Sequence, residues 1–249
     1  MLPPRARSIC RSFSRKHPRS FEPTILSPLL RHSVSTSYRN LSLRASPSTI
    51  DVSGLVIKTT DAPRPKVPAS ELKFGQTFTD HMLVVNWTAQ NGWETPEIMP
   101  YGSLQIDPSA SVFHYATCLF EGMKAYKSRD GKIRLFRPEM NMKRMNQSAQ
   151  RLAFPVLILT AIAYSTGHSL CIRPTIIGSG PGLGVGPPRE LTLFVSCSPV
   201  GPYYRTGFKP ISLLASSKYC RAWPGGSGAF KLDANYPTGF LPQMERREE

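Results

Sequence analysis

A single lysine in a glycine-rich segment constrains this chain more than any other feature. Residues 219–243 read YCRAWPGGSGAFKLDANYPTGFLPQ, so Lys231 follows a run of glycines and precedes an Asn-Tyr-Pro turn. A lysine held by rigid backbone beside apolar and aromatic groups loses its proton more easily, and a neutral amine can condense with an aldehyde. Lys231 is therefore the first candidate for a catalytic residue.

The glycines alone do not identify a nucleotide site. A nucleotide P-loop needs Gly-Lys-Ser or Gly-Lys-Thr, and a dinucleotide loop needs G-x-G-x-x-G. Lys231 follows Phe230 and precedes Leu232, and the second glycine cluster, GSGPGLGVG at residues 178–186, lacks a third glycine at the required spacing. Taken by itself, the segment favours a hairpin loop that carries a solvated lysine, because most lysines are exposed.

Positive charge is concentrated at the start of the chain. The net charge is +15, and residues 1–50 contribute +8 because they hold nine arginines and lysines but one glutamate. The segment is also rich in serine and has no long apolar run, which is typical of a mitochondrial transit peptide. We expect this leader over residues 1–45, with processing near residues 39–42, and a linker over residues 46–70. The alternative is a basic arm that binds nucleic acid or an anionic membrane.

The cysteines and histidines show no metal-ligand spacing. The chain has five histidines and five cysteines, without a C-x-x-C pair: Cys10, Cys118, Cys171, Cys197 and Cys220. We therefore predict no metal site, and we expect the cysteines to be buried thiols in a reducing compartment.

Periodicity predicts several elements of secondary structure. Residues 123–136 place an Asp130-Gly131 turn between two short runs, which indicates a hairpin. From Pro138 onward the apolar residues recur at helical spacing: Met142, Met145, Ala149 and Leu152. Arg144 lies off that stripe. Further strands are expected at residues 169–177, 191–196 and 211–216.

An apolar run covers residues 152–164. It is too short to span a bilayer, so we expect a buried helix or strand there and no membrane segment.

Seven segments together resemble branched-chain amino-acid aminotransferases, which are pyridoxal-phosphate enzymes, and they occur in the same order. They are FGQTFTDHMLVVNW from Phe74, HYATCLFEGMKAYK from His114, LFRPEMNMKRMNQSAQRLAFP from Leu135, SLCIRPTIIG from Ser169, PGLGVGPPREL from Pro181, SPVGPYYRTGF from Ser198 and the lysine segment from Tyr219. The resemblance implies an α/β (α+β), two-domain class IV aminotransferase fold with pyridoxal 5'-phosphate as cofactor.

The resemblance also implies a domain organisation. It gives a small domain over residues 71–198, an interdomain linker over residues 199–204, and over residues 205–249 the start of a large pyridoxal-phosphate domain that is truncated. The acidic partner of the cofactor ring nitrogen and a second phosphate-binding loop are then expected outside these residues. Two alternatives follow: an inactive fragment or pseudoenzyme of the family, and a basic anion-binding mitochondrial protein.

Specific roles follow from matching residues to the family. Lys231 resembles the catalytic, cofactor-bearing lysine, Arg144 the arginine that binds the cofactor phosphate, and Tyr236 the tyrosine beside the cofactor's phenolic oxygen. Substrate residues are implied at Phe74, Tyr115, Phe120, Arg173, Leu183 and Val185. The aromatic residues among these resemble apolar walls, and Arg173 resembles a carboxylate-binding arginine.

The resemblance implies an amino-group transfer from leucine, isoleucine or valine to 2-oxoglutarate in the mitochondrial matrix. Leu183 and Val185 match a loop that a partner subunit contributes, so a homodimer is expected, with no nucleic-acid or membrane partner.

Overall fold

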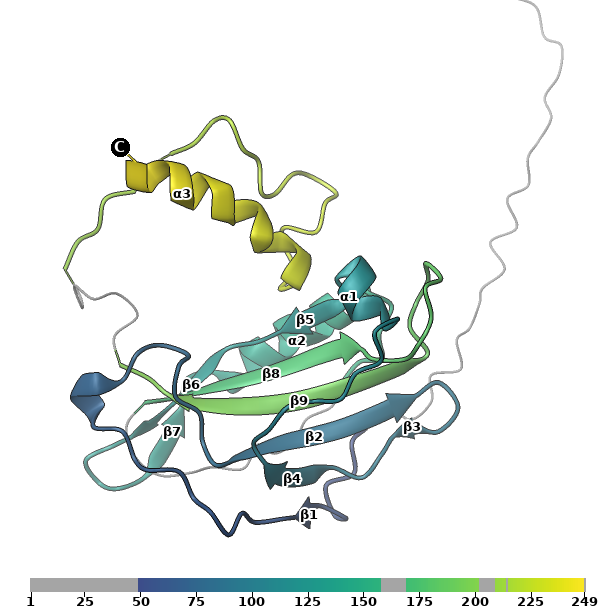
Figure 1. The fold of residues 1–249 in the computed structure, drawn as a ribbon, viewed down its shortest axis with the longest axis vertical. Coiled ribbons are helices and arrows are strands. Elements are labelled where there is room, and N and C mark those ends of the chain that lie inside the picture. Colours follow the sequence, from purple (N-terminus) through teal and green to yellow (C-terminus); the bar gives the residue numbers. More distant parts are fainter. Residues whose placement is uncertain (1–48, 158–168, 202–208, 214, 249) are drawn as a thin grey trace, which may run out of the picture. The chain divides into compact units, whose positions relative to one another are not determined.

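The computed structural model describes residues 49–157, 169–201, 209–213 and 215–248 (Figure 1). The predicted leader over residues 1–45, residues 158–164 of the apolar run and residues 202–204 of the predicted interdomain linker lie outside the described residues. The predicted domain boundaries stay predictions.

A mainly antiparallel sheet organises the described residues (Figure 1). Its strands follow the order β1-β4-β2-β9-β8-β6-β7, with β3 paired to β2 and β5 paired to β8. Within the described ranges every pair is antiparallel except β1 with β4. The strands are β1 (Val56–Ile57), β2 (His81–Thr88), β3 (Gly92–Trp93), β4 (Glu97–Pro100), β5 (Cys118–Phe120), β6 (Met123–Lys127), β7 (Ile133–Leu135), β8 (Leu170–Gly178) and β9 (Glu190–Pro199).

In the part of the chain that the structure describes, three α-helices and three short 3-10 helices accompany the sheet. They are α1 (Ser111–Tyr115), α2 (Pro138–Arg151), α3 (Phe240–Glu248), η1 (Ala69–Glu71), η2 (Asp233–Asn235) and η3 (Pro237–Gly239). The longest, α2, packs against β5, and α1 packs against β8. Helices beside an antiparallel sheet make an α+β fold, which confirms the predicted class.

The predicted hairpin and helix are both confirmed. Strands β6 and β7 pair across the Asp130-Gly131 turn, where Gly131 has a φ of 78° that glycine adopts without strain. Pro138 opens α2, a position at which its missing N–H costs no hydrogen bond. Met145 and Ala149 are fully buried on the inner face of the helix.

Strands β8 and β9 form the longest pairing, from Leu170 opposite Pro199 to Gly178 opposite Leu191. Nearly every residue of β8 is buried, because neighbouring elements cover both of its faces. A strand buried on both faces is a continuous apolar run and not an alternation. The predictions for residues 169–177 and 191–196 are confirmed.

The strand predicted at residues 211–216 is wrong for the residues described there. Residues 211–213 and 215–216 are not assigned to a strand, and the Leu213 side chain is 81% exposed. Apolar alternation alone does not produce a strand, because cross-strand pairs and burial of one face stabilise it.

In the described part of the apolar run after α2, Phe154 and Leu157 are buried, but residues 152–157 are a turn and irregular backbone. Ala153 takes a left-handed φ of 56°, and Pro155 interrupts any regular ladder. The Asn146 side chain instead bonds both backbone groups of Leu157, at 2.8 Å each. The expectation of a regular helix or strand is therefore wrong over residues 152–157.

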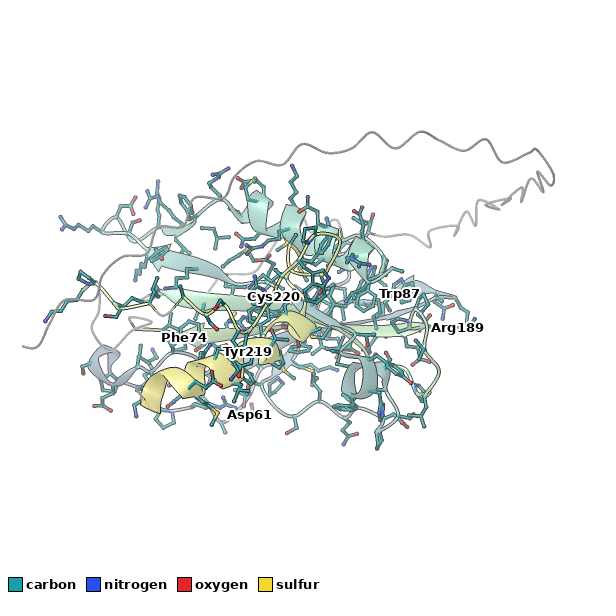
Figure 2. The ribbon with its side chains drawn as sticks, turned by 90° about the horizontal axis from the view of Figure 1, so that it is seen from above. Asp61, Phe74, Trp87, Arg189, Tyr219 and Cys220 are labelled. Atoms are coloured by element: carbon teal, nitrogen blue, oxygen red, sulfur yellow. The ribbon has the colours of Figure 1, made fainter. Side chains whose placement is uncertain are left out.

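The expectation of uniformly buried cysteines also needs correction. Cys118 and Cys171 are buried and Cys197 is half-buried, but Cys220 is exposed in the glycine-rich segment (Figure 2). Cys10 lies outside the described residues. Burial, together with the nearby Cys171, raises the pKa of the Cys197 thiol to about 11, and burial raises that of Cys118 further. Both buried thiols are thus held in the unreactive, protonated form.

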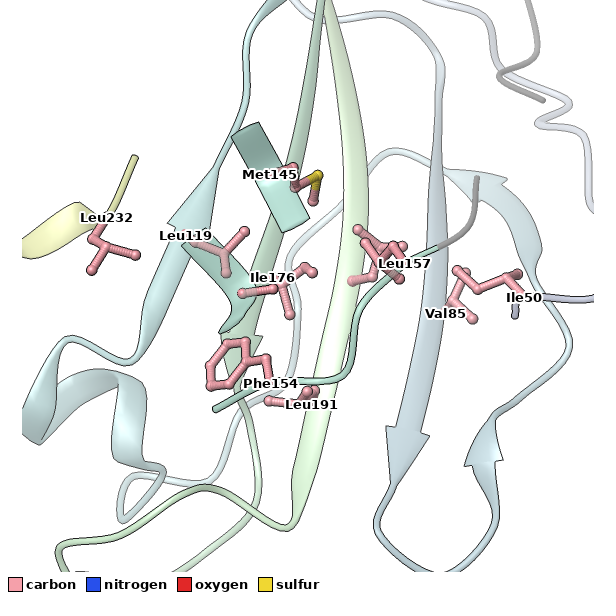
Figure 3. Packing of buried hydrophobic residues seen from close by; sticks show 11 residues of the cluster. Ile50, Val85, Leu119, Met145, Phe154, Leu157, Ile176, Leu191 and Leu232 are labelled. Atoms are coloured by element: carbon pink, nitrogen blue, oxygen red, sulfur yellow. The ribbon is translucent and has the colours of Figure 1, made fainter. Parts of the chain in front are cut away.

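The main hydrophobic core joins the sheet, α2 and the lysine segment (Figure 3). Leu119 on β5, Met145 on α2 and Ile176 on β8 have no exposed surface, and Leu232, next to Lys231, is 3% exposed. The cluster comprises Ile50, Val85, Leu119, Met145, Ala149, Phe154, Leu157, Ile176, Leu191, Leu193 and Leu232. The lysine segment is therefore anchored in the core.

Candidate active site

The backbone of Lys231 is fixed on both sides. Its N–H donates to the Oγ atom of Ser148 on α2 at 2.9 Å, and its carbonyl accepts from the N–H of Phe120 at 3.2 Å. The next residue, Leu232, forms a β-bridge with Leu119. Lys231 thus sits where α2 and β5 meet, and the core anchors it through its neighbour.

Asn235 closes the loop that carries Lys231. Its buried side chain donates from Nδ2 to the carbonyls of Ser227 and Phe230, at 2.9 Å each, and its Oδ1 atom lies 2.7 Å from the Ser227 hydroxyl. Gly228 lies so close to Ala222 that a Cβ there would fall 2.2 Å from the alanine Cβ. These contacts supply the rigid backbone that the sequence predicts around the lysine.

We expect Asn235→Asp to loosen this loop, because a carboxylate would face two carbonyl oxygens that now accept hydrogen bonds. Leaving buried carbonyls unpaired costs about 1–3 kcal/mol of unfolding free energy. Urea unfolding measures the loss, and amide exchange over residues 226–232 localises it. The same substitution at the exposed Asn91 serves as control and should change neither; equal effects at both positions would contradict the role of Asn235.

The Lys231 amine lies against two aromatic rings. Its Nζ atom donates to the Tyr236 hydroxyl at 2.8 Å and lies 4.2 Å from the centre of the Phe120 ring. The Phe120 and Tyr236 rings are 5.0 Å apart. The fold therefore brings together three of the residues that the sequence predicts for the site.

Arg173 on β8 joins this group through Phe120. Its guanidinium carbon lies 4.9 Å from the centre of the Phe120 ring, and its buried Nε has no hydrogen-bond partner among the described residues. An unpaired buried donor carries an energetic cost that an anionic ligand can offset. Arg173 and Lys231 therefore share Phe120 as a neighbour, and Arg173 has donor capacity to spare.

Arg144 on α2 makes an ion pair with Glu121, the residue after Phe120. Its Nε lies 2.5 Å from Oε1 of Glu121 and its Nη2 lies 2.9 Å from Oε2. One helical turn further along α2, the Ser148 hydroxyl accepts from the Lys231 N–H, so Arg144 and the lysine backbone contact the same stretch of helix. The predicted phosphate-binding arginine is therefore near Lys231, but a carboxylate already holds it.

Burial opposes ionisation of Glu121, but hydrogen bonds from Arg144, Asn141 and the Gly122 N–H outweigh it, so the pKa of this carboxyl lies below its ordinary value of 4.5. The folded state therefore releases this proton more readily than the unfolded state does. The ionised pair contributes stability above about pH 4.5, and that contribution is lost as the pH falls through the lower folded-state pKa.

We expect the wild-type chain to exceed Glu121→Gln in unfolding free energy by more at about pH 6.5 than at about pH 3.5, because only the wild type carries this titrating group. Urea unfolding of both proteins at the two pH values measures the difference. A difference that stays constant or grows in acid would contradict the ionised pair.

The other predicted substrate residues lie apart from this cluster in the contacts described. Tyr115, at the end of α1, donates through its hydroxyl to the Leu183 carbonyl at 2.5 Å, and Ser109 holds the Gly182 N–H at 2.9 Å. Val185 is 86% exposed. Phe74 is half-buried in the turn after η1 (Figure 2). Their roles toward a substrate stay predictions.

Glu121, Ser148 and Asn235 were not predicted from the sequence. A glutamate inside the apolar run CLFEGM was a signal, because an acid among strand residues requires a partner. Ser148 and Asn235 act through hydrogen bonds to distant backbone, for which the sequence carries no comparable pattern.

Two kinds of feature are absent from the described ranges. No three histidine, cysteine or acidic side chains gather there as metal ligands. No helix there is long and apolar enough to cross a bilayer.

Comparison with solved structures defines the fold class. A crystal structure of the Escherichia coli branched-chain amino acid aminotransferase matches with a TM-score of 0.53 and 24% identity, over 68% of this chain and 57% of that one. The described residues therefore share the aminotransferase fold.

Sequence comparison identifies the family. The cytosolic branched-chain-amino-acid aminotransferase of Saccharomyces cerevisiae is 53% identical over 212 residues, which is 79% of this chain and 56% of the yeast protein. Its mitochondrial counterpart is 48% identical over 232 residues, 87% of this chain and 59% of that protein. No family model matches the sequence. The chain belongs to the branched-chain-amino-acid aminotransferase family, and it spans somewhat more than half the length of these relatives.

Proposed function

We propose that this chain binds pyridoxal 5'-phosphate at Lys231 and transfers the amino group of leucine, isoleucine or valine to 2-oxoglutarate. The observation that carries the proposal is the placement of the Lys231 amine, 2.8 Å from the Tyr236 hydroxyl and 4.2 Å from the centre of the Phe120 ring, which Arg173 also contacts. The relatives' names support the substrate class.

The site residues fit such a cofactor. An aldehyde needs an amine, which Lys231 supplies, and a phosphate needs fixed cationic donors, for which a guanidinium is well suited. Arg144 gives only the Nε and Nη2 donors to Glu121, so the outer edge of its guanidinium keeps donors for phosphate. Tyr236 lies where its hydroxyl can bond a cofactor oxygen.

When bound, pyridoxal phosphate supplies an electron sink for charge that develops on the substrate's α-carbon. Side chains of this protein transfer the proton, orient the amine and bind the substrate. Lys231 Nζ takes and returns a proton as general base and acid, and the Tyr236 hydroxyl orients that amine. Arg173 is the candidate for the substrate carboxylate, and Phe120, with Phe74 and Tyr115, for the apolar walls around a branched side chain.

An assay of the 249-residue chain with leucine, isoleucine, valine, aspartate and lysine as amino donors tests the proposal. We expect 2-oxoglutarate to be converted to glutamate with the three branched donors and not with the two charged ones. Turnover with aspartate or lysine alone would contradict the substrate class. Cofactor bound at Lys231 without turnover by any donor would replace the proposal by its alternative, an inactive member of the family.

We further propose that residues 1–45 direct the chain to mitochondria, on the strength of their arginine and serine content. The yeast relatives include both a cytosolic and a mitochondrial protein. A fluorescent reporter fused to this segment should enter mitochondria, and the same fusion with its arginines and lysine changed to glutamine should not. A cytosolic reporter in the first case would refute the proposal.

We also propose a homodimer in which the loop that carries Leu183 and Val185 meets the partner subunit. Both side chains are exposed in this chain, although they are apolar. Sedimentation of the wild type against Val185→Asp tests this, because a charge at the contact should shift a dimer toward monomer.

A further inference from the structure

Glu121 is the only charged side chain that is buried among the described residues, and its exposed fraction is 0%. Taking a carboxylate out of water is costly unless hydrogen bonds satisfy it. Four do so here: Nε and Nη2 of Arg144, Nδ2 of Asn141 at 2.8 Å, and the Gly122 N–H at 3.1 Å. Glu121 and the three residues that donate to it, Arg144, Asn141 and Gly122, are called the anchor below.

The anchor holds Arg144 by one edge only. A guanidinium presents two edges for paired hydrogen bonds, one through Nε and one Nη atom, the other through both Nη atoms. Glu121 takes the first edge with both of its oxygens. Arg144 is 49% exposed although its partner has no exposed surface, so the second edge remains toward solvent.

The anchor is itself rigid. Glu121 follows β5, and its N–H donates to the Pro174 carbonyl on β8 at 2.8 Å. Asn141, one turn before Arg144 on α2, bonds Glu121 Oε2 and also donates to the Gly122 carbonyl at 3.2 Å. Sheet and helix therefore meet at this carboxylate, on the residue next to Phe120, which contacts Lys231.

An arginine on an exposed helix face is otherwise mobile. Its long side chain samples many rotamers, and a ligand that binds it must immobilise them at a cost in affinity. Because Glu121 already holds the inner edge, that cost is met in the folded protein before any ligand arrives.

We propose that Glu121 is a positioning residue for phosphate recognition: it clamps the inner edge of Arg144 so that the outer edge faces the phosphate of a ligand at Lys231. The inference rests on the proposed function. It assigns Glu121 no contact with the ligand and no part in the chemistry at the amine.

The test compares pyridoxal phosphate with pyridoxal, which has the same aldehyde but lacks the phosphate. Absorbance titration of the full chain gives the dissociation constant of each ligand. The ratio of the constant for pyridoxal to the constant for pyridoxal phosphate measures the preference for the phosphate, and a lower ratio means a weaker preference. In Glu121→Gln we expect the ratio to fall about 3- to 10-fold, the effect of freeing one long side chain. Binding of pyridoxal should change little.

A matched control is Asp130→Asn, which removes the other two-bond carboxylate–arginine pair, between Asp130 and Arg134 at the surface. It should leave the ratio unchanged. Arg144→Gln should lower the ratio at least as far as Glu121→Gln does, and adding Glu121→Gln to it should have no further effect, because the two residues act as one unit.

Glu121→Gln replaces the buried carboxylate by an amide, whereas Arg144→Lys leaves Glu121 itself unchanged and so provides a second variant. A lysine keeps the charge but cannot be clamped through two bonds, so we expect the ratio to stay low. Full preference for the phosphate in Arg144→Lys, or in Glu121→Gln, would overturn the inference while leaving the proposed function intact. Equal weakening of both ligands would also overturn it, since that indicates a purely structural role. If the wild type binds neither aldehyde, or binds both equally, the proposed cofactor role fails and the inference with it.

Discussion

We expect Lys231→Ala to remove the pyridoxal-phosphate absorbance that the chain retains after dialysis, and to lower the turnover of leucine with 2-oxoglutarate by about 10²- to 10⁴-fold. The reason is that Nζ of Lys231 is the amine held against Tyr236 and Phe120, and alanine offers neither a nucleophile nor a proton carrier. Phosphate contacts at Arg144 would persist, so cofactor should still bind weakly and reversibly.

Lys218→Ala is the matched control for this prediction. Lys218 lies immediately before the glycine-rich segment, but it is exposed and pairs with Glu245 at 3.0 Å. The control should retain both the absorbance and the turnover of the wild type. If Lys231→Ala keeps them as well, the assignment of the catalytic lysine is wrong.

The largest effect on stability is expected from Leu119→Ala. Leu119 has no exposed surface, contacts the core that joins β8 and α2, and bridges to Leu232 (Figure 3). Removing a buried leucine side chain costs about 2–5 kcal/mol of unfolding free energy, because transfer and cavity contributions add. Cofactor affinity should also fall, since Leu232 loses the contact that anchors the lysine segment.

Urea unfolding and cofactor titration of the same variant measure the two effects together. Phe136→Ala is the control, because its side chain is 76% exposed and its loss should change the unfolding free energy by less than about 0.5 kcal/mol. A Leu119→Ala protein with wild-type stability would contradict the described core. A Leu119→Ala protein that is destabilised but binds cofactor with unchanged affinity would contradict the claim that the core anchors the lysine segment.

Elements with a strong local pattern could be predicted from the sequence. The stripe through Met145 and Ala149 and the proline at its start define α2, and the Asp130-Gly131 turn defines the hairpin. Each signal involves a few neighbouring residues and a repeat that matches one backbone geometry. Strands β8 and β9 were also predicted, with bounds within one to three residues of those observed.

Predictions failed where distant partners decide the structure. Residues 211–213 alternate like a strand but are not assigned to one, and Asn146 bonds the backbone at Leu157 where a regular element was expected. Neither fact is visible in local spacing, because each depends on residues brought close only by the fold.

The site residues also fall into a predicted group and a group that was not predicted. Lys231, Arg144, Phe120, Arg173 and Tyr236 were predicted by their resemblance to family motifs, and the fold brings them into one neighbourhood. The residues that hold them were not predicted: Ser148 is four residues beyond Arg144 and bonds the lysine backbone, and Glu121 fixes the guanidinium. Such supporting contacts join different elements, so their chemistry is recognised only after the elements are placed.

The most direct test of the central claim is to locate the attached cofactor. The chain is incubated with pyridoxal phosphate, reduced with borohydride so that the aldehyde carbon stays bound to the amine that holds it, and mapped by peptide mass spectrometry. We predict a single dominant phosphopyridoxyl group on Lys231. Modification spread over Lys218 and other exposed lysines at a level equal to Lys231 would contradict the account.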